Sequence, residues 1–165
     1  KAVDLMPKER EFRTVRGYQL QKQGSGRLTP SMEDYLEMIY RNCQQAPFVR
    51  VNVLADQLNV QAPSVSRTVR RLAEQGYVSY RKYGVIELTD KGEQLGSYLL
   101  ARHEIIEMFL QNLGVTTSLL VDTELIEHYL SPDTVLAMET WNAFLSANDD
   151  VLQRLAEFKR TSDAQ

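Results

Sequence analysis

Two carboxylates and an imidazole lie close together in one short stretch of the sequence. Glu124, Glu127 and His128 follow one another at i, i+3 and i+4, so a helix would place all three on one face. Gathering these groups is costly unless a positive charge lies between them. Carboxylate oxygen and imidazole nitrogen together suit a divalent metal such as manganese, iron or zinc. A solvated helix face is the alternative, because charged residues are mostly exposed.

Charge is distributed unevenly along the 165 residues. Up to Lys91 there are 15 Lys and Arg residues against 10 Asp and Glu, whereas from Gly92 onward there are 4 against 12. We therefore expect the front half, residues 1–91, to bind a polyanion and the back half, residues 92–165, to bind cations. The single cysteine, Cys43, excludes a disulfide framework or a thiolate zinc cluster within one chain. No apolar run reaches the roughly 20 residues of a membrane helix, so we expect a cytoplasmic protein.

The chain begins with a basic, polar extension, residues 1–28. This extension either contacts DNA or a partner, or is a mobile tail, and the sequence leaves both interpretations open. A helix is then expected to begin at residues 29–31 and to end before the loop at residues 44–48. Asp34 and Glu37 lie on this helix at i and i+3, on a stripe beside its apolar face.

The stretch from Arg50 to Leu88 has the pattern of a helix-turn-helix followed by a β-hairpin. A short helix ending near Asn59 precedes a second helix from Pro63 to Gln75, whose outward residues are rich in Ser, Thr and Arg. Two strand-like runs then enclose a basic, glycine-bearing loop. This pattern predicts a winged helix, with a generic three-helix core as the alternative. The residues expected to contact DNA are Gln61, Ser64, Ser66, Arg67, Arg70, Arg71, Arg81 and Lys82.

The rest of the chain is predicted to be helical. A long helix begins at Thr89-Asp90, carries His103 and ends near Leu113, and two later amphipathic helices give a broad apolar surface that indicates dimerisation. The expected fold is mainly α, with an N-terminal winged helix-turn-helix (three helices plus a β-hairpin wing) followed by an all-helical dimerisation and metal-binding domain. The expected domains are the basic extension 1–28, the winged-helix DNA-binding domain 29–90 and the helical dimerisation and metal-binding domain 91–165.

Five segments resemble the diphtheria-toxin-repressor family of metal-dependent transcription regulators, closest to its manganese transport repressor branch. They are T-P-S-M-E-D-Y-L-E at 29–37, A-P-S-V-S-R at 62–67, L-T-D-K-G at 88–92, R-H-E-I-I-E-M-F-L at 102–110 and E-L-I-E-H-Y-L-S at 124–131. The metal ligands that the resemblance implies are Asp34, Glu37, His103, Glu124, Glu127 and His128.

The resemblance also implies a function. Iron-responsive relatives have methionine at the position of Asp34 and cysteine at that of Glu124, so the oxygen ligands here favour Mn(II), as two ions per subunit. Fe(II), Co(II), Cd(II) or Zn(II) are possible substitutes. The expected protein is a homodimeric repressor of metal-uptake genes that binds a palindromic operator in double-stranded DNA, with no membrane partner and no organic cofactor.

Three alternatives remain open at this point. An iron-responsive repressor of the same family differs only in its metal. A two-metal hydrolase also uses paired carboxylates and histidines, but no separate base or oxyanion donor is evident, and we expect no enzyme activity. A metal-free winged-helix regulator would instead sense a small molecule.

Overall fold

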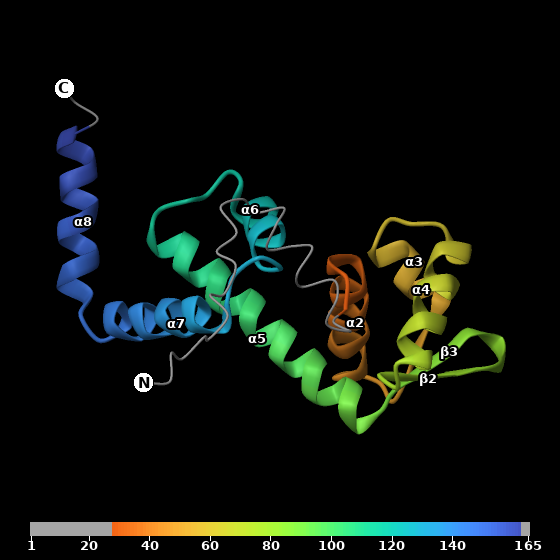
Figure 1. The fold of residues 1–165 in the computed structure, drawn as a ribbon. Helices are drawn as coiled ribbons and strands as arrows, with labels where there is room; N and C mark the ends of the chain where they lie inside the picture. Colours follow the sequence, from red (N-terminus) through yellow and green to blue (C-terminus); the bar gives the residue numbers. More distant parts are fainter. Residues whose placement is uncertain (1–27, 163–165) are drawn as a thin grey trace, which may run out of the picture.

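The computed structural model describes residues 28–162, so the predicted basic extension lies outside the described residues except for Leu28. The elements in chain order are α2 (Pro30–Cys43), β1 (Val49–Arg50), α3 (Val51–Gln57), α4 (Ala62–Glu74), β2 (Val78–Arg81), the 3₁₀ turn η1 (Lys82–Gly84), β3 (Val85–Leu88), α5 (Asp90–Asn112), α6 (Leu119–Ile126), α7 (Pro132–Ser146) and α8 (Asp149–Ser162) (Figure 1). This order confirms the mainly α fold with a winged helix at its front.

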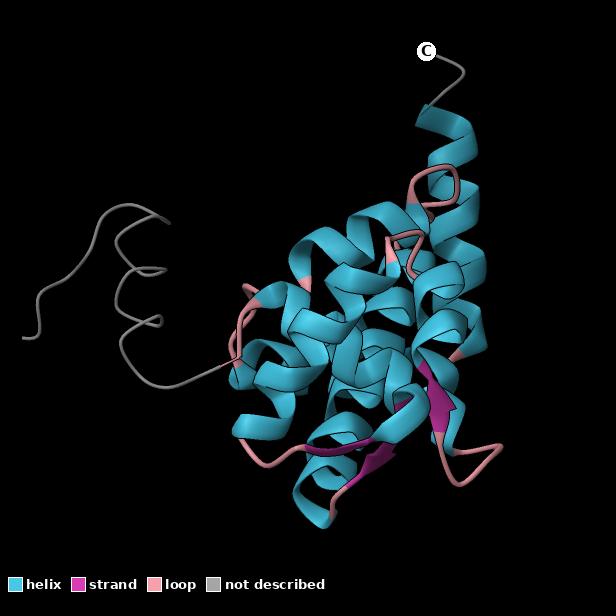
Figure 2. Ribbon diagram, turned by 90° about the vertical axis from the view of Figure 1, so that its right-hand side faces the viewer, coloured by secondary structure: helices cyan, strands magenta, loops and turns pink. Residues whose placement is uncertain are grey.

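The winged helix packs helices α2, α3 and α4 against a small antiparallel sheet (Figure 2). It lies at the end of the molecule opposite α8 (Figure 1). Its strand order is β1-β3-β2, and the β2–β3 hairpin, with η1 at its tip, is the wing. The two-residue strand β1 was not predicted. The largest fully buried side chains of this core are Leu36, Ile39, Leu54, Leu72, Ile86, Leu99, Val65 and Val69.

Helix α4 is the second helix of the helix-turn-helix, and its bounds agree with the prediction to within one residue. Its N-cap is Gln61, and Pro63 lies in the first turn, where its missing N–H costs nothing. Beyond the helix, Gly76 adopts a φ of 78°, which a residue with a side chain rarely adopts. The chain therefore reverses there, and the Tyr77 N–H donates to the Leu72 carbonyl over 3.0 Å.

Helix α5 belongs to both parts of the molecule, because it runs from the wing to the helices of the back half (Figure 1). The Thr89 hydroxyl caps it by accepting from the Gly92 N–H over 3.1 Å. Its first half packs on α2, and Leu99 is part of the winged-helix core. A Cβ on Gly96 would lie only 2.6 Å from Tyr40 Cβ, so glycine permits this close crossing of the two helices.

The second half of α5 carries the helical back half. The buried Asn142 of α7 donates to the Ile105 carbonyl over 2.9 Å and accepts from Asn112 Nδ2 over 3.1 Å. Helix α8 lies at the opposite end of the molecule from the wing, and Lys159 donates to the Leu113 carbonyl at the end of α5 (Figure 1). Among the described residues, no helix has the length and apolar character needed to span a membrane.

Candidate metal centre and DNA-binding surface

The acidic stretch that carries Glu124, Glu127 and His128 folds differently from the prediction. Helix α6 ends at Ile126, Glu127 is its C-cap, and His128 lies in the turn that follows. The prediction of one helix that carries Glu124, Glu127 and His128 and stops near Ser131-Pro132 is therefore wrong at its end. After Ile126 the chain forms a turn, in which the Tyr129 N–H donates to the Ile126 carbonyl over 3.0 Å. Pro132 restricts only the residue directly before it to extended backbone. Ser131 accordingly has a ψ of 154° and serves as the N-cap of α7.

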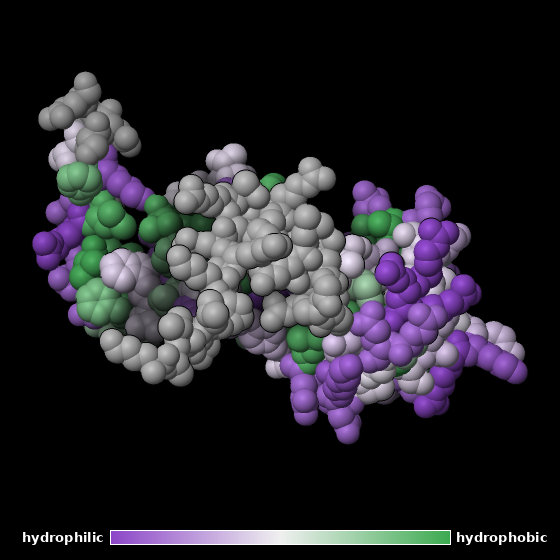
Figure 3. All heavy atoms as spheres, in the orientation of Figure 1, coloured by the Kyte–Doolittle hydropathy of each residue, from purple (hydrophilic) through white to green (hydrophobic). Residues whose placement is uncertain are grey.

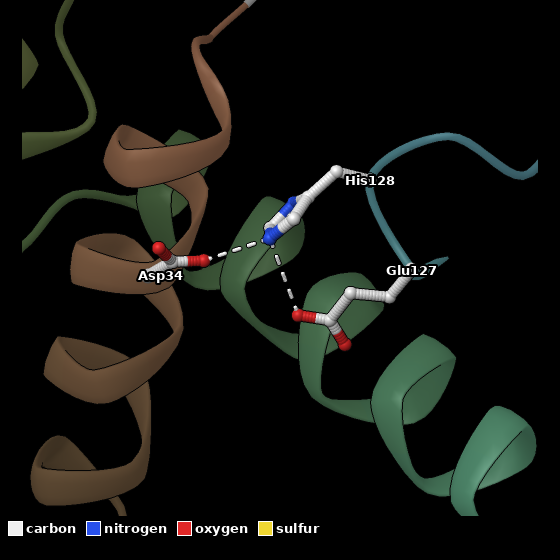
Figure 4. Close-up of side chains that lie close together, drawn as sticks. All are labelled: Asp34, Glu127 and His128. Atoms are coloured by element: carbon white, nitrogen blue, oxygen red, sulfur yellow. Dashed lines mark ion pairs between the residues drawn. The ribbon is translucent and has the colours of Figure 1, made fainter. Parts of the chain in front are cut away.

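The turn nevertheless brings His128 to helix α2. His128 Nε2 lies 2.9 Å from Asp34 Oδ1 and 3.6 Å from Glu127 Oε1 (Figure 4). Each of these three residues offers one ligand atom, and the three atoms lie within 4.8 Å of one another. We call this trio the His128 cluster.

A second trio, the His103 cluster, lies beside the first and shares Glu127 with it. It consists of Glu37 on α2, His103 on α5 and Glu127, all three buried, with ligand atoms again within 4.8 Å of one another. His103 Nδ1 lies 3.0 Å from Glu127 Oε2, so the two oxygens of Glu127 face different histidines. Glu37 also accepts from Arg41 over 2.8 and 2.9 Å, so one of its oxygens is already paired with a cation.

Glu124 lies at the edge of these clusters. Its side chain is 50% exposed, and its Oε1 is 3.8 Å from His103 Nδ1. Partial burial, followed by the charge of Glu127, raises the pKa of the Glu124 carboxyl above its ordinary value. A cation would relieve that repulsion, but Glu124 belongs to neither trio, so its role as a ligand stays a prediction.

The carboxylates strongly perturb both histidines. Burial by itself would lower the pKa of His128, but the Asp34 and Glu33 carboxylates outweigh it and raise this pKa to about 9. The hydrogen bond to Glu127 raises the pKa of His103 above its usual value, against the opposing effect of burial. The carboxylates therefore stabilise positive charge on both rings.

One buried carboxylate oxygen without a hydrogen bond indicates whether these residues fit a divalent metal. Asp34 Oδ1 is buried and forms no hydrogen bond within the described residues, although it faces His128 Nε2 at 2.9 Å. Since Nδ1 of this ring faces Glu33, a neutral ring presents a lone pair to Asp34, and the two lone pairs repel unless a proton or a metal ion lies between them. The oxygen and nitrogen donors, with no sulfur among them, fit a divalent metal.

Two residues of this region were missed by the sequence reasoning. Glu33 Oε2 lies 2.9 Å from His128 Nδ1 and also accepts from Arg102 Nη2 over 2.9 Å. The hydrogen bond from His128 and the pairing with Arg102 hold the pKa of Glu33 below its ordinary value, although burial alone would raise it. The available signal was adjacency, because each residue directly precedes a predicted ligand, Asp34 or His103.

The residues predicted to contact DNA lie on α4 and the wing. Gln61, Ser64, Arg67, Arg70 and Arg71 are exposed. The remaining three differ from one another in their contacts. Ser66 is half-buried and its hydroxyl accepts from the Tyr80 hydroxyl over 3.3 Å, which ties α4 to the wing. On the wing, Arg81 pairs with Glu87 over 2.7 Å, whereas Lys82 is exposed and has no ion-pair partner in residues 28–162.

Similarity to known proteins identifies the family. Residues 27–86 match the family described as "Iron dependent repressor, N-terminal DNA binding domain", and residues 89–154 match "Iron dependent repressor, metal binding and dimerisation domain". The HTH-type transcriptional regulator MntR of Lysinibacillus sphaericus (strain C3-41) is 38% identical over 132 residues, which cover 79% of this chain and 95% of that protein. The chain belongs to the iron-dependent repressor family.

Family membership confirms the resemblance to the diphtheria-toxin-repressor family and its manganese branch. The protein is a transcription regulator and not an enzyme, with one domain that binds DNA and one that binds a divalent metal and dimerises. The expected domain boundary near residue 90 stays a prediction.

Two solved structures of manganese regulators share this fold. The "manganese regulator SloR" matches with a TM-score of 0.61 and 33% sequence identity. The matched region covers 69% of this chain and 54% of the SloR chain. A "manganese-dependent transcriptional repressor complex with manganese" matches with a TM-score of 0.60 and 30% sequence identity. The matched region covers 68% of this chain and 53% of the repressor chain. This chain therefore spans about half the length of those solved chains.

Proposed function

We propose that this protein is a manganese-responsive repressor of metal-uptake genes, in which metal binding between α2, α5 and the turn after α6 controls DNA binding. The observation that carries the proposal is Glu127. Its side chain is 1% exposed, and its two oxygens face the two histidine clusters. Glu127 would hold an ion together with Asp34 and His128 and a second ion together with Glu37 and His103, so two ions per subunit are proposed.

The donor set supports Mn(II). Asp34, Glu37 and Glu127 supply oxygen, and the two histidines supply nitrogen, with Glu124 as a further oxygen donor. Hard oxygen ligands without sulfur suit manganese, and relatives named for manganese regulation have the same fold. Fe(II) as the physiological ion is the alternative, and Co(II), Cd(II) or Zn(II) are possible substitutes.

The proposed mechanism uses a difference between two contacts. Helices α2 and α5 pack directly through Gly96 and Tyr40, so their crossing does not depend on a metal. The turn after α6, in contrast, meets α2 through charged side chains, His128 against Glu33 and Asp34. Asp34, Glu127 and His128 would hold a divalent ion, which would supply positive charge between the carboxylates of the turn and those of α2. Without the ion, only the proton on His128 supplies positive charge there. The carboxylate of Glu127 and those of α2 then repel, the turn moves away from α2, and the DNA-competent geometry becomes a minor state.

The DNA complex follows from the dimer. Two subunits related by a two-fold axis present two α4 helices, which enter successive major grooves when their spacing matches one helical turn of DNA. The operator is therefore proposed to be palindromic. Such a repressor works in the cytoplasm, where it meets chromosomal DNA.

The experiment begins with selection of duplexes from a random pool in the presence of Mn(II), because the operator is unknown. Affinity for a selected duplex is then measured with Mn(II), Fe(II), Co(II), Zn(II) and Mg(II), and with chelator. The proposal predicts the tightest binding with Mn(II), weak binding with chelator, and loss of the metal effect in His128→Ala. Glu139→Ala, which removes an exposed carboxylate on α7, serves as the control and should behave as wild type. Equal affinity with Mn(II) and with chelator would contradict the proposal.

A further inference from the structure

The ring of His128 lies between two consecutive carboxylates of helix α2. Its Nε2 faces Asp34 Oδ1 at 2.9 Å, and its Nδ1 faces Glu33 Oε2 at 2.9 Å. The two carboxylates therefore address opposite nitrogens of one ring. Only the Nε2 side is shared with Glu127, so Glu33 lies outside the His128 cluster.

Arg102 fixes the position of Glu33. Its Nη2 donates to Glu33 Oε2 over 2.9 Å and lies 3.5 Å from His128 Nδ1. Arg102 is 6% exposed, and Glu33 is its one acidic partner within the described residues. A buried guanidinium is stable only when it is paired, so each member of this ion pair holds the other in place. The pair joins α2 to α5 beside both histidines without using any predicted ligand.

We propose that Glu33 and Arg102 are positioning residues for the metal site at the His128 cluster. Glu33 accepts the Nδ1–H of His128, which places the proton on Nδ1 and directs the Nε2 lone pair toward Asp34 and Glu127. Arg102 holds the Glu33 carboxylate in the orientation that this hydrogen bond requires. The inference rests on the proposed function, in which the His128 cluster binds a divalent ion.

The His103 cluster provides an internal control, since its histidine does not use this pair. His103 Nδ1 faces Glu127 and Glu124, and Glu33 is not among its partners in the described part of the chain. Loss of Glu33 should therefore weaken one metal site and spare the other. A general loss of structure would weaken both sites together.

The test measures Mn(II) bound per subunit in the full chain, from the electron paramagnetic resonance signal of free Mn(II). In Glu33→Ala one of two sites should weaken by about 10- to 100-fold, the usual effect of losing a residue that orients a ligand, while the other keeps its affinity. Glu33→Gln should recover most of the lost affinity, because its amide oxygen still accepts from Nδ1–H. Glu104→Ala, which removes an exposed carboxylate next to His103, is the matched control and should leave both sites unchanged.

Nitrogen NMR of the histidine rings gives a second readout that does not depend on DNA binding. The chain has only two histidines, so the rings of His103 and His128 are readily assigned. With diamagnetic Zn(II) or Cd(II), wild type should show His128 protonated at Nδ1 and metal-bound at Nε2. Glu33→Ala should lose this pattern for His128 and keep the His103 signals.

Three results would overturn the inference. Unchanged Mn(II) affinity at both sites in Glu33→Ala would exclude a positioning role, and so would equal weakening of both sites. If Glu33→Gln loses as much affinity as Glu33→Ala, Glu33 is itself a ligand. Failure of the proposed function is distinguishable, because wild type would then bind no Mn(II).

Discussion

The winged helix and the helical back half bury their apolar residues to very different extents. The front core contains Leu36, Ile39, Leu54, Val65, Val69, Leu72 and Ile86, each 0% exposed. In the described part of the helical back half, the buried aliphatic side chains are Ile106, Val135 and Leu145. The back half instead exposes many large apolar side chains, namely Met108, Leu113, Leu120, Val121, Leu125, Tyr129, Leu136, Trp141, Phe144 and Phe158.

The surfaces differ in the same way. Hydrophobic residues gather along α8 and beside it, whereas hydrophilic residues cover α4 and the wing (Figure 3). Exposed apolar surface of this extent marks a binding interface. The front half is therefore complete as a single subunit, and the back half is completed by a second copy, in agreement with the dimerisation domain that the family assigns to it. The His128 and His103 clusters lie where the two halves meet.

Truncation of one buried leucine should give the largest effect. Leu72→Ala removes a fully buried side chain of α4 and should lower the free energy of unfolding by about 2–5 kcal/mol. Leu136→Ala is the same truncation at a side chain that is 61% exposed on α7, and should change the stability of the subunit by less than about 0.5 kcal/mol. Urea denaturation of dilute protein measures both, and equal losses would refute the contrast between the halves.

Loss of an exposed aromatic residue should weaken the dimer. Trp141 is 43% exposed and its ring centroid lies 5.7 Å from that of Phe144, so the two rings form an apolar patch on α7. Trp141→Ala should cost the dimer about 2 kcal/mol or more, measured by sedimentation at several protein concentrations. Phe48→Ala, an aromatic residue with 37% exposure in the winged helix, is the control. A dimer weakened equally by both would place the interface elsewhere.

The exposed arginine near the start of α4 should affect DNA recognition. Arg67→Ala should cost about 1–3 kcal/mol on the selected duplex and relax sequence preference, as expected for a bidentate base contact. The affinity for Mn(II) without DNA should not change, because Arg67 is exposed on α4, a helix that carries none of the predicted ligands. If affinity falls equally on a scrambled duplex, with a shallower salt dependence, Arg67 is a phosphate contact and Gln61, Ser64 and Ser66 become the base readers.

The smallest effect is expected at the wing. Lys82→Ala should weaken binding to all duplexes alike and lower the salt dependence by about one ion per subunit. Arg154→Ala, which removes an exposed cation on α8, should leave DNA binding unchanged. The Trp141→Ala effect should, in contrast, vary little with salt, because apolar contacts are not screened. Identical salt slopes for wild type and Lys82→Ala would exclude a phosphate contact.

The sequence predicted most of the fold because apolar spacing alone locates long helices. Helix α4 buries Val65, Val69 and Leu72 at the predicted i, i+4 and i+7 positions. Strand β1 was missed because two residues are too short to show a periodicity. The end of α6 was placed too late because helical spacing continues to His128, whereas the chain already turns after Ile126.

The site was predicted less completely than the fold. Residue type and family resemblance were enough to propose Asp34, Glu37 and Glu127 as ligands, and these residues do converge. The role proposed for Glu33 depends on contacts with Arg102 and His128, which lie 69 and 95 residues away in the sequence. No local pattern reports a hydrogen bond over such a separation.

The measurement that tests the central claim most directly is Mn(II) affinity with and without the selected duplex. If metal binding controls DNA binding, thermodynamic linkage requires that DNA also controls metal binding, by the same factor. We predict tighter Mn(II) binding in the presence of DNA, by the same factor by which Mn(II) strengthens DNA binding. His128→Ala should show no such coupling. Equal Mn(II) affinities with and without DNA in wild type would contradict the account.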